Sequence, residues 1–195
     1  MKKLIPLLFA FYCSLGHSET TEPTESTEQS SLQQALSAKN KELSEKSLKQ
    51  LNLLFNKTYK KAEPQLLTNG SFIPYGAIVG RDGKVNFIQV NNEANTNPEK
   101  TVYAIQSAMI DLAKQQQIFA SAVYYMAYNL ETAEGKLDKA IVGKLEHATG
   151  LSLAIASEVQ ITEKTVSYSD PITSTISSEV FFWAYKDQTK VGNSP

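Results

Sequence analysis

The chain has 195 residues, of which 42% are hydrophobic, and this is enough for one domain with a proper core. Its 19 basic and 20 acidic residues give a net charge of −1, and no basic face or cluster is visible. This charge pattern argues against a nucleic-acid-binding protein, because such proteins concentrate positive charge on one face.

The N-terminus has the pattern of a secretory signal peptide. Lys2 and Lys3 form a positive segment, residues 4–13 form an apolar run, and Gly16 and Ser18 suit positions −3 and −1 of a cleavage site. We therefore predict a signal peptide at residues 1–18 and an exported chain that is periplasmic or secreted. The apolar run is shorter than the about 20 residues that span a bilayer, so we expect no transmembrane segment in the mature chain.

Cys13 is the only cysteine. One interpretation is a lipidated cysteine, but that signal has small residues immediately upstream, where this chain has Phe11 and Tyr12. The other is an ordinary residue of the signal peptide. In the second case the mature chain has no thiol, which excludes an intramolecular disulfide and thiolate metal ligation.

Residues 19–43 are predicted as a disordered acidic linker with a frayed helix start, because residues 19–31 hold no apolar side chain. A single α+β domain is expected at 44–187 and a flexible tail at 188–195. The first helix of this domain has an apolar stripe, which consists of Leu48, Leu51, Leu54, Phe55, Tyr59 and Ala62. Pro64 should end or kink this helix. Its lysine-rich remainder leaves a membrane-surface helix open, although covering a sheet explains the stripe better.

A β-hairpin is expected next, with strands at residues 72–79 and 85–90. Asp82 and Gly83 lie between them and suit a tight turn. Pro74 lacks an N–H and therefore belongs at the start of the strand or on an edge.

A second helix should begin at Asn97 and Pro98 and finish near Gln116. Asn97 is the expected N-cap. The apolar stripe of this helix consists of Val102, Ile105, Ala108, Met109, Leu112 and Ala113.

The C-terminal half is predicted to be all β. Strands are expected at residues 119–130, 137–146 and 151–161, and Asp170 with Pro171 should break the chain. Residues 179–185 are expected as a last strand, with Phe182 and either Val180 or Trp183 in the core. The fold class is therefore α+β: a single antiparallel sheet of about five strands, in the order α-β-β-α-β-β-β, packed with two main helices.

The segment Gly70–Gly76, GSFIPYG, followed by the Asp-Gly turn at 82–85, resembles a motif of a family of small uncharacterised bacterial proteins. Residues 119–123 and 144–150 are similar to later parts of that family. The resemblance implies no activity and no site residue, because none is established for the family. The element order also resembles profilin- and roadblock-type platforms, by topology only.

His147 is the only histidine that remains after cleavage. It could act as a general base with Glu146, but neighbouring strand residues point to opposite faces, so we expect a surface residue beside a turn. No G-x-S-x-G motif, phosphate loop or metal-ligand pattern is visible, so we predict no catalytic residue, no metal and no cofactor.

Aromatic residues are the remaining candidates for function. Tyr75, Tyr124, Tyr128 and Trp183 could form a binding surface, or they could pack beneath helices and across strands. The sequence favours an exported, non-enzymatic binding module for an unknown envelope protein or small ligand. Two alternatives stay open: an envelope hydrolase built from scattered Ser, Asp and Lys residues, and a structural subunit of a homodimer or envelope complex that uses the first helix.

Overall fold

The structure is a computed structural model and describes residues 25–90 and 97–186. The chain divides into two compact units, Met1–Ala38 and Lys39–Pro195, and the fold described below is that of the second. The predicted signal peptide 1–18 with Cys13, the loop at 91–96 and the tail at 188–195 lie outside the described residues. Along the part of the chain that is described, no helix combines the length and apolar character needed to cross a membrane.

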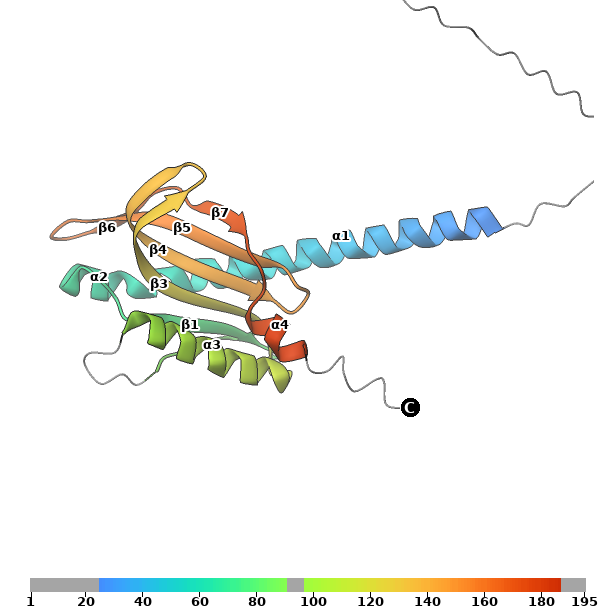
Figure 1. Cartoon of the computed structure of the whole chain (residues 1–195), viewed down its shortest axis with the longest axis horizontal. Helices are drawn as coiled ribbons and strands as arrows, with labels where there is room; N and C mark the ends of the chain where they lie inside the picture. Colours follow the sequence, from blue (N-terminus) through green and yellow to red (C-terminus); the bar gives the residue numbers. More distant parts are fainter. Residues whose placement is uncertain (1–24, 91–96, 187–195) are drawn as a thin grey trace, which may run out of the picture. The chain divides into compact units, whose positions relative to one another are not determined.

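The second unit is built on one antiparallel sheet. Its strands are β1 (Tyr75–Gly80), β2 (Val85–Ile88), β3 (Ile118–Thr132), β4 (Gly135–His147), β5 (Ser152–Ile161), β6 (Val166–Tyr168) and β7 (Ile172–Thr175). The strand order is β2-β1-β3-β4-β5-β6, and β7 pairs with another part of β5 (Figure 1). The α+β class and the antiparallel sheet are confirmed, but the sheet has seven strands instead of about five.

The helices are α1 (Glu25–Thr58), α2 (Glu63–Asn69), α3 (Pro98–Lys114) and α4 (Val180–Tyr185), and a 3-10 turn at Tyr59–Ala62 joins α1 to α2. They lie on both faces of the sheet, with α1 and α2 on one and α3 and α4 on the other (Figure 1). β1 is therefore buried on both faces, which explains its unbroken apolar sequence.

Helix α1 begins at Glu25, inside the segment 19–43 that is expected to be a disordered acidic linker with a frayed helix start. Residues 28–46 are rich in Glu, Gln, Lys, Leu and Ala, which have high helix propensity even where no apolar stripe exists. Toward its C-terminal end, α1 buries Ser47, Leu51, Leu54 and Thr58, which are spaced by three or four residues. Leu48 was expected in this stripe but is 44% exposed.

Two stacked tyrosines form the centre of the core beneath α1. The rings of Tyr75 and Tyr124 lie 5.0 Å apart, on adjacent strands. The Tyr75 hydroxyl shares its one hydrogen between the carbonyl oxygens of Thr58 and Tyr59, at 2.9 and 3.1 Å, where α1 changes to the 3-10 turn. Thr58 Oγ1 donates to Leu54 O, so the Tyr124 hydroxyl donates to Thr58 Oγ1 at 2.8 Å.

On the other face, α3 approaches β1 at Gly76. A Cβ atom on this glycine would lie 2.5 Å from Met109 Cε and 2.7 Å from Ile105 Cγ2. The helix is confirmed as predicted at its N-terminus, where the Asn97 side chain accepts a hydrogen bond from Glu99 N at 2.8 Å. The hairpin is confirmed as well, although β1 starts at Tyr75 rather than at residue 72.

The last predicted strand is wrong, because residues 180–185 form helix α4. Its buried side chains are Val180, Phe181 and Ala184, whereas Phe182 and Trp183 are 53% and 49% exposed. Phe181 and Ala184 follow Val180 by one and four residues, which places all three on one face of a helix, whereas a strand would bury every second residue. Contacts between α4 and residues that are distant in the sequence thus override the β propensity of the sequence EVFFWAY.

Candidate binding surface around helix α4

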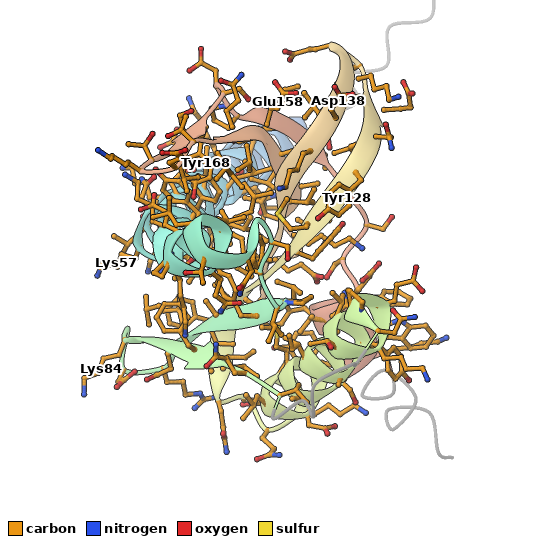
Figure 2. The ribbon with its side chains drawn as sticks, turned by 90° about the vertical axis from the view of Figure 1, so that its left-hand side faces the viewer. Lys57, Lys84, Tyr128, Asp138, Glu158 and Tyr168 are labelled. Carbon is orange, nitrogen blue, oxygen red and sulfur yellow. The ribbon has the colours of Figure 1, made fainter. Side chains whose placement is uncertain are left out.

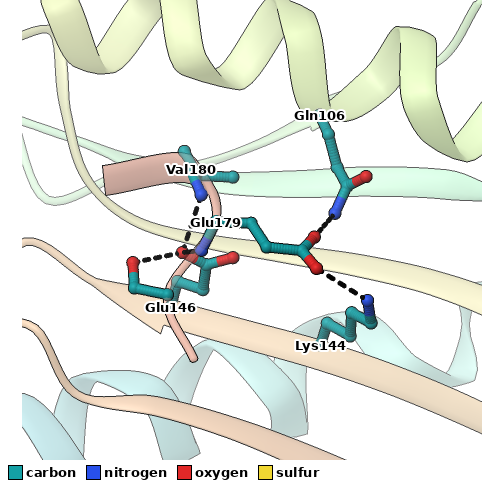
Figure 3. Close-up of polar contacts among 6 residues, drawn as sticks. Gln106, Lys144, Glu146, Glu179 and Val180 are labelled. Carbon is teal, nitrogen blue, oxygen red and sulfur yellow. Dashed lines mark hydrogen bonds and ion pairs between the residues drawn. The ribbon is translucent and has the colours of Figure 1, made fainter. Parts of the chain in front are cut away.

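The N-terminus of α4 is held by a buried carboxylate of the sheet. Glu146 on β4 is 2% exposed, and its Oε2 atom accepts three hydrogen bonds. The donors are Ser178 Oγ at 2.7 Å, Glu179 N at 2.9 Å and Val180 N at 2.9 Å (Figure 3). Two of them are backbone groups at the start of the helix, which would otherwise have no partner. Hydrogen bonds to a charged acceptor are the stronger kind, so Glu146 fixes the position of α4 on the sheet.

A second polar cluster connects α4 to α3. The Glu179 carboxylate lies 3.3 Å from Lys144 Nζ through Oε1, and Gln106 of α3 donates its Nε2 amide hydrogen to Oε2 (Figure 3). Lys144 and Glu179 are 29% and 45% exposed, so this ion pair is partly shielded from solvent. The cluster holds Glu179 at the boundary between the two helices.

A hollow of about 430 Å³ lies between the two helices. We call it the α3–α4 hollow, and it is lined by Tyr103, Gln106, Ser107, Ile110, Glu179 and Trp183. Tyr103 is 75% exposed and Trp183 is 49% exposed, so both aromatic rings are open to solvent. The hollow therefore combines aromatic surface with a carboxylate, an amide and a hydroxyl group.

A second, more apolar hollow lies on the opposite side of α4. Its volume is about 480 Å³, and it is lined by Ala148, Thr149, Gly150, Ser178, Phe181, Phe182, Tyr185 and Lys186. The Lys186 ammonium lies 4.3 Å from the ring centre of Trp183 and 5.8 Å from that of Phe182, which are cation–π contacts. Helix α4 is thus a short aromatic ridge with a hollow on each side.

The four aromatic residues predicted for binding do not come together. Tyr75 and Tyr124 are 1% and 0% exposed and belong to the core beneath α1, so they form no part of an exposed surface. Burial raises the pKa of both phenols above the ordinary value, which keeps them neutral and able to donate hydrogen bonds.

Tyr128 and Trp183 are both exposed but lie on different sides of the sheet. Tyr128 is 58% exposed and points to the same face as Tyr124, which α1 covers. It lies with Asp138 in the half of the β3–β4 hairpin nearer the turn that joins the two strands, away from α3 (Figure 2). Of the four predicted residues, only Trp183 lines the α3–α4 hollow.

His147 is not the surface residue that the sequence predicts, since it is only 6% exposed. Thr149 N donates to its Nδ1 at 3.1 Å, so the ring is neutral and its Nε2 donates to Gln50 Oε1 at 2.7 Å. Burial and the nearby Lys46 lower the pKa of His147, in agreement with a neutral ring. The residue therefore joins the end of β4 to α1.

Neither His147 nor Glu146 has the arrangement of a catalytic base. As expected for neighbouring strand residues, Glu146 points toward α4 and His147 toward α1. Oε2 of Glu146 already accepts from Ser178 and two backbone groups, so this contact does not activate the serine hydroxyl. Within residues 25–90 and 97–186, no cluster of three or more His, Cys, Asp or Glu side chains could hold a metal ion.

Sequence reasoning missed most of the lining of the α3–α4 hollow. Tyr103 carried one usable signal, because it falls off the apolar stripe of the predicted helix and should therefore point to solvent. Gln106 and Glu179 carried none, since their contact joins residues 73 positions apart.

The chain was compared with protein-family models, with curated proteins and with solved structures, and none of the three comparisons gave a significant match.

Proposed function

We propose that this chain is an exported, non-enzymatic binding module and that α4 with the adjoining part of α3 forms its binding surface. The observation that carries the proposal is the exposure of three large aromatic side chains, Tyr103, Phe182 and Trp183, beside two hollows. Trp and Tyr are enriched in binding surfaces, where they supply large contact area at low conformational cost. The buried Glu146 contact supports the proposal further, because a surface held rigidly loses less entropy on binding.

Export rests on the signal-peptide pattern of residues 1–18. Cell fractionation of the full-length chain should find a processed form outside the cytoplasm, with a new N-terminus after Ser18. Unprocessed protein that stays in the cytoplasm would contradict this part of the proposal.

The binding surface is tested by affinity capture from an envelope extract with wild-type, Trp183→Ala and Tyr128→Ala chains. Tyr128 is a matched control, because it is similarly exposed but lies on the other side of the sheet. We expect Trp183→Ala to lose a partner that Tyr128→Ala retains. Equal recovery of every partner by all three chains would contradict the proposal.

The subunit alternative is less well supported by α1. Its exposed leucines in the second unit are Leu43, Leu48 and Leu53, and they follow one another at steps of five residues. Each residue turns an α-helix by about 100°, so these side chains point in three different directions and form no continuous stripe. A homodimer that uses this helix would need such a stripe. The likeness to profilin- and roadblock-type platforms that the sequence predicts would likewise supply no function.

A further inference from the structure

We propose that the α3–α4 hollow binds a neutral saccharide, with Trp183 as the stacking surface and Gln106 and Glu179 as the hydrogen-bonding groups. This inference rests on the proposed function, and it adds the chemical class of the ligand. The volume of about 430 Å³ falls within the range of about 300–1,000 Å³ that is usual for small-molecule sites.

The aromatic and polar groups of the hollow complement the two kinds of surface on a sugar ring. The C–H groups of a pyranose form an apolar face that can stack on the electron-rich face of an indole. Its hydroxyl groups both donate and accept, and they pair well with planar amide and carboxylate groups. Trp183 supplies the ring, Gln106 and Glu179 supply the planar groups, and Ser107 adds an exposed hydroxyl at the wall.

Both planar groups keep hydrogen-bonding capacity for a ligand. Gln106 uses one amide hydrogen for Glu179 Oε2, which leaves its carbonyl oxygen and second amide hydrogen. The Glu179 carboxylate accepts one bond from Gln106 and one from Lys144, and each of its oxygens has a further lone pair. A ligand hydroxyl can therefore bind without breaking the cluster that holds α4 to α3.

The charges around the hollow favour a neutral ligand. Glu179 is the one charged residue among the six that line the hollow, and Lys144, at 3.3 Å, neutralises it. A charged ligand would therefore lose its hydration without meeting an unpaired opposite charge among the six lining residues. A purely apolar ligand would remove water from Gln106 and Glu179 without replacing its hydrogen bonds. A polyhydroxyl compound with one apolar face avoids both costs.

Trp183 is the only tryptophan in the chain, so its fluorescence reports on the surroundings of α4, and the variants below assign the signal to this hollow. The full-length chain, purified as cells produce it, would be titrated with neutral oligosaccharides of glucose, galactose, mannose and N-acetylglucosamine. Choline and a sulfated disaccharide serve as cationic and anionic comparison ligands. We expect a saturable change in tryptophan emission with at least one neutral oligosaccharide and none with choline or the sulfated disaccharide.

Calorimetry with variants then assigns the binding groups. Trp183→Ala and Gln106→Ala should each weaken saccharide binding at least tenfold, whereas Tyr128→Ala should leave it unchanged. All three side chains are at least partly exposed, and an unchanged denaturation midpoint will show that each variant folds normally.

The saccharide proposal is overturned if no neutral oligosaccharide binds, if choline or the sulfated disaccharide binds in its place, or if Trp183→Ala binds saccharide as the wild type does. If Trp183→Ala nevertheless loses the partner captured from the envelope, the binding surface stands and only the ligand class is wrong. If Trp183→Ala retains both the saccharide and the captured partner, the proposed function fails as well.

Discussion

Replacing Glu146 should release helix α4 from the sheet. The carboxylate is 2% exposed and accepts hydrogen bonds from Ser178 Oγ and from the backbone N–H groups of Glu179 and Val180. In Glu146→Ala these donors lose their acceptor inside the protein. They must either stay buried without a partner or reach water by moving away with α4.

The size of the effect follows from these two routes. A hydrogen bond to a charged group contributes about 1.5–3 kcal/mol, and a buried donor without a partner costs about 1–3 kcal/mol. Detachment of α4 sets an upper limit, because it exposes Val180 and Phe181, whose burial contributes about 1.5–3 kcal/mol each. We therefore expect a loss of about 3 kcal/mol in the free energy of unfolding, which is more than a hundredfold in the folding equilibrium.

Urea denaturation measures this loss, and the emission of Trp183 separates the two routes. A loss of about 3 kcal/mol lowers the urea midpoint by about 1–3 M. If α4 detaches, the emission of Trp183 shifts to the red before the sheet unfolds, because the buried half of the indole enters water. Glu146→Gln keeps an oxygen acceptor without the charge and should lose about half as much, since charge-assisted bonds are about twice as strong as neutral ones.

Glu163→Ala is the control, because this glutamate is exposed in the turn between β5 and β6. It should change the free energy of unfolding by no more than about 0.5 kcal/mol. If Glu146→Ala unfolds at the same urea concentration as Glu163→Ala and has the emission spectrum of the wild type, then the carboxylate does not hold α4.

Three further predictions concern the core. Gly143→Ala should lower the free energy of unfolding by about 1–3 kcal/mol, because the new Cβ would lie 2.8 Å from the ring of Tyr124. An unchanged denaturation midpoint would contradict this close packing. Tyr75→Phe removes the donor to the Thr58 carbonyl and should cost about 1–3 kcal/mol in thermal or urea denaturation, and a fully stable variant would show that this bond contributes nothing. The pKa of His147 is lowered in the folded state, so its contribution to stability is complete above the unfolded value of 6.5 and declines as the pH falls below it. Denaturation of wild type and His147→Gln from neutral to mildly acidic pH should show this decline only in the wild type, and parallel curves would exclude it.

Much of the element pattern was readable from local sequence. Helix α3 has its Asn97 cap and apolar stripe, the β1–β2 hairpin has its Asp-Gly turn, and β3, β4 and β5 lie where the sequence predicts strands. Each of these signals lies within a few residues of the element that it specifies, which is why no tertiary information was needed.

Helix α4 and the burial of the aromatic residues could not be predicted in this way. The sequence EVFFWAY has the composition of a strand, and only Glu146, more than thirty residues earlier in the chain, supplies the acceptor that the first backbone groups of a helix require. Tyr75 and Trp183 are equally aromatic in the sequence, yet one is 1% and the other 49% exposed. Local pattern therefore determined the succession of most helices and strands, and it predicts the export signal. The tertiary structure alone decided which aromatic residues reach the surface, because burial depends on what the other elements place over a side chain.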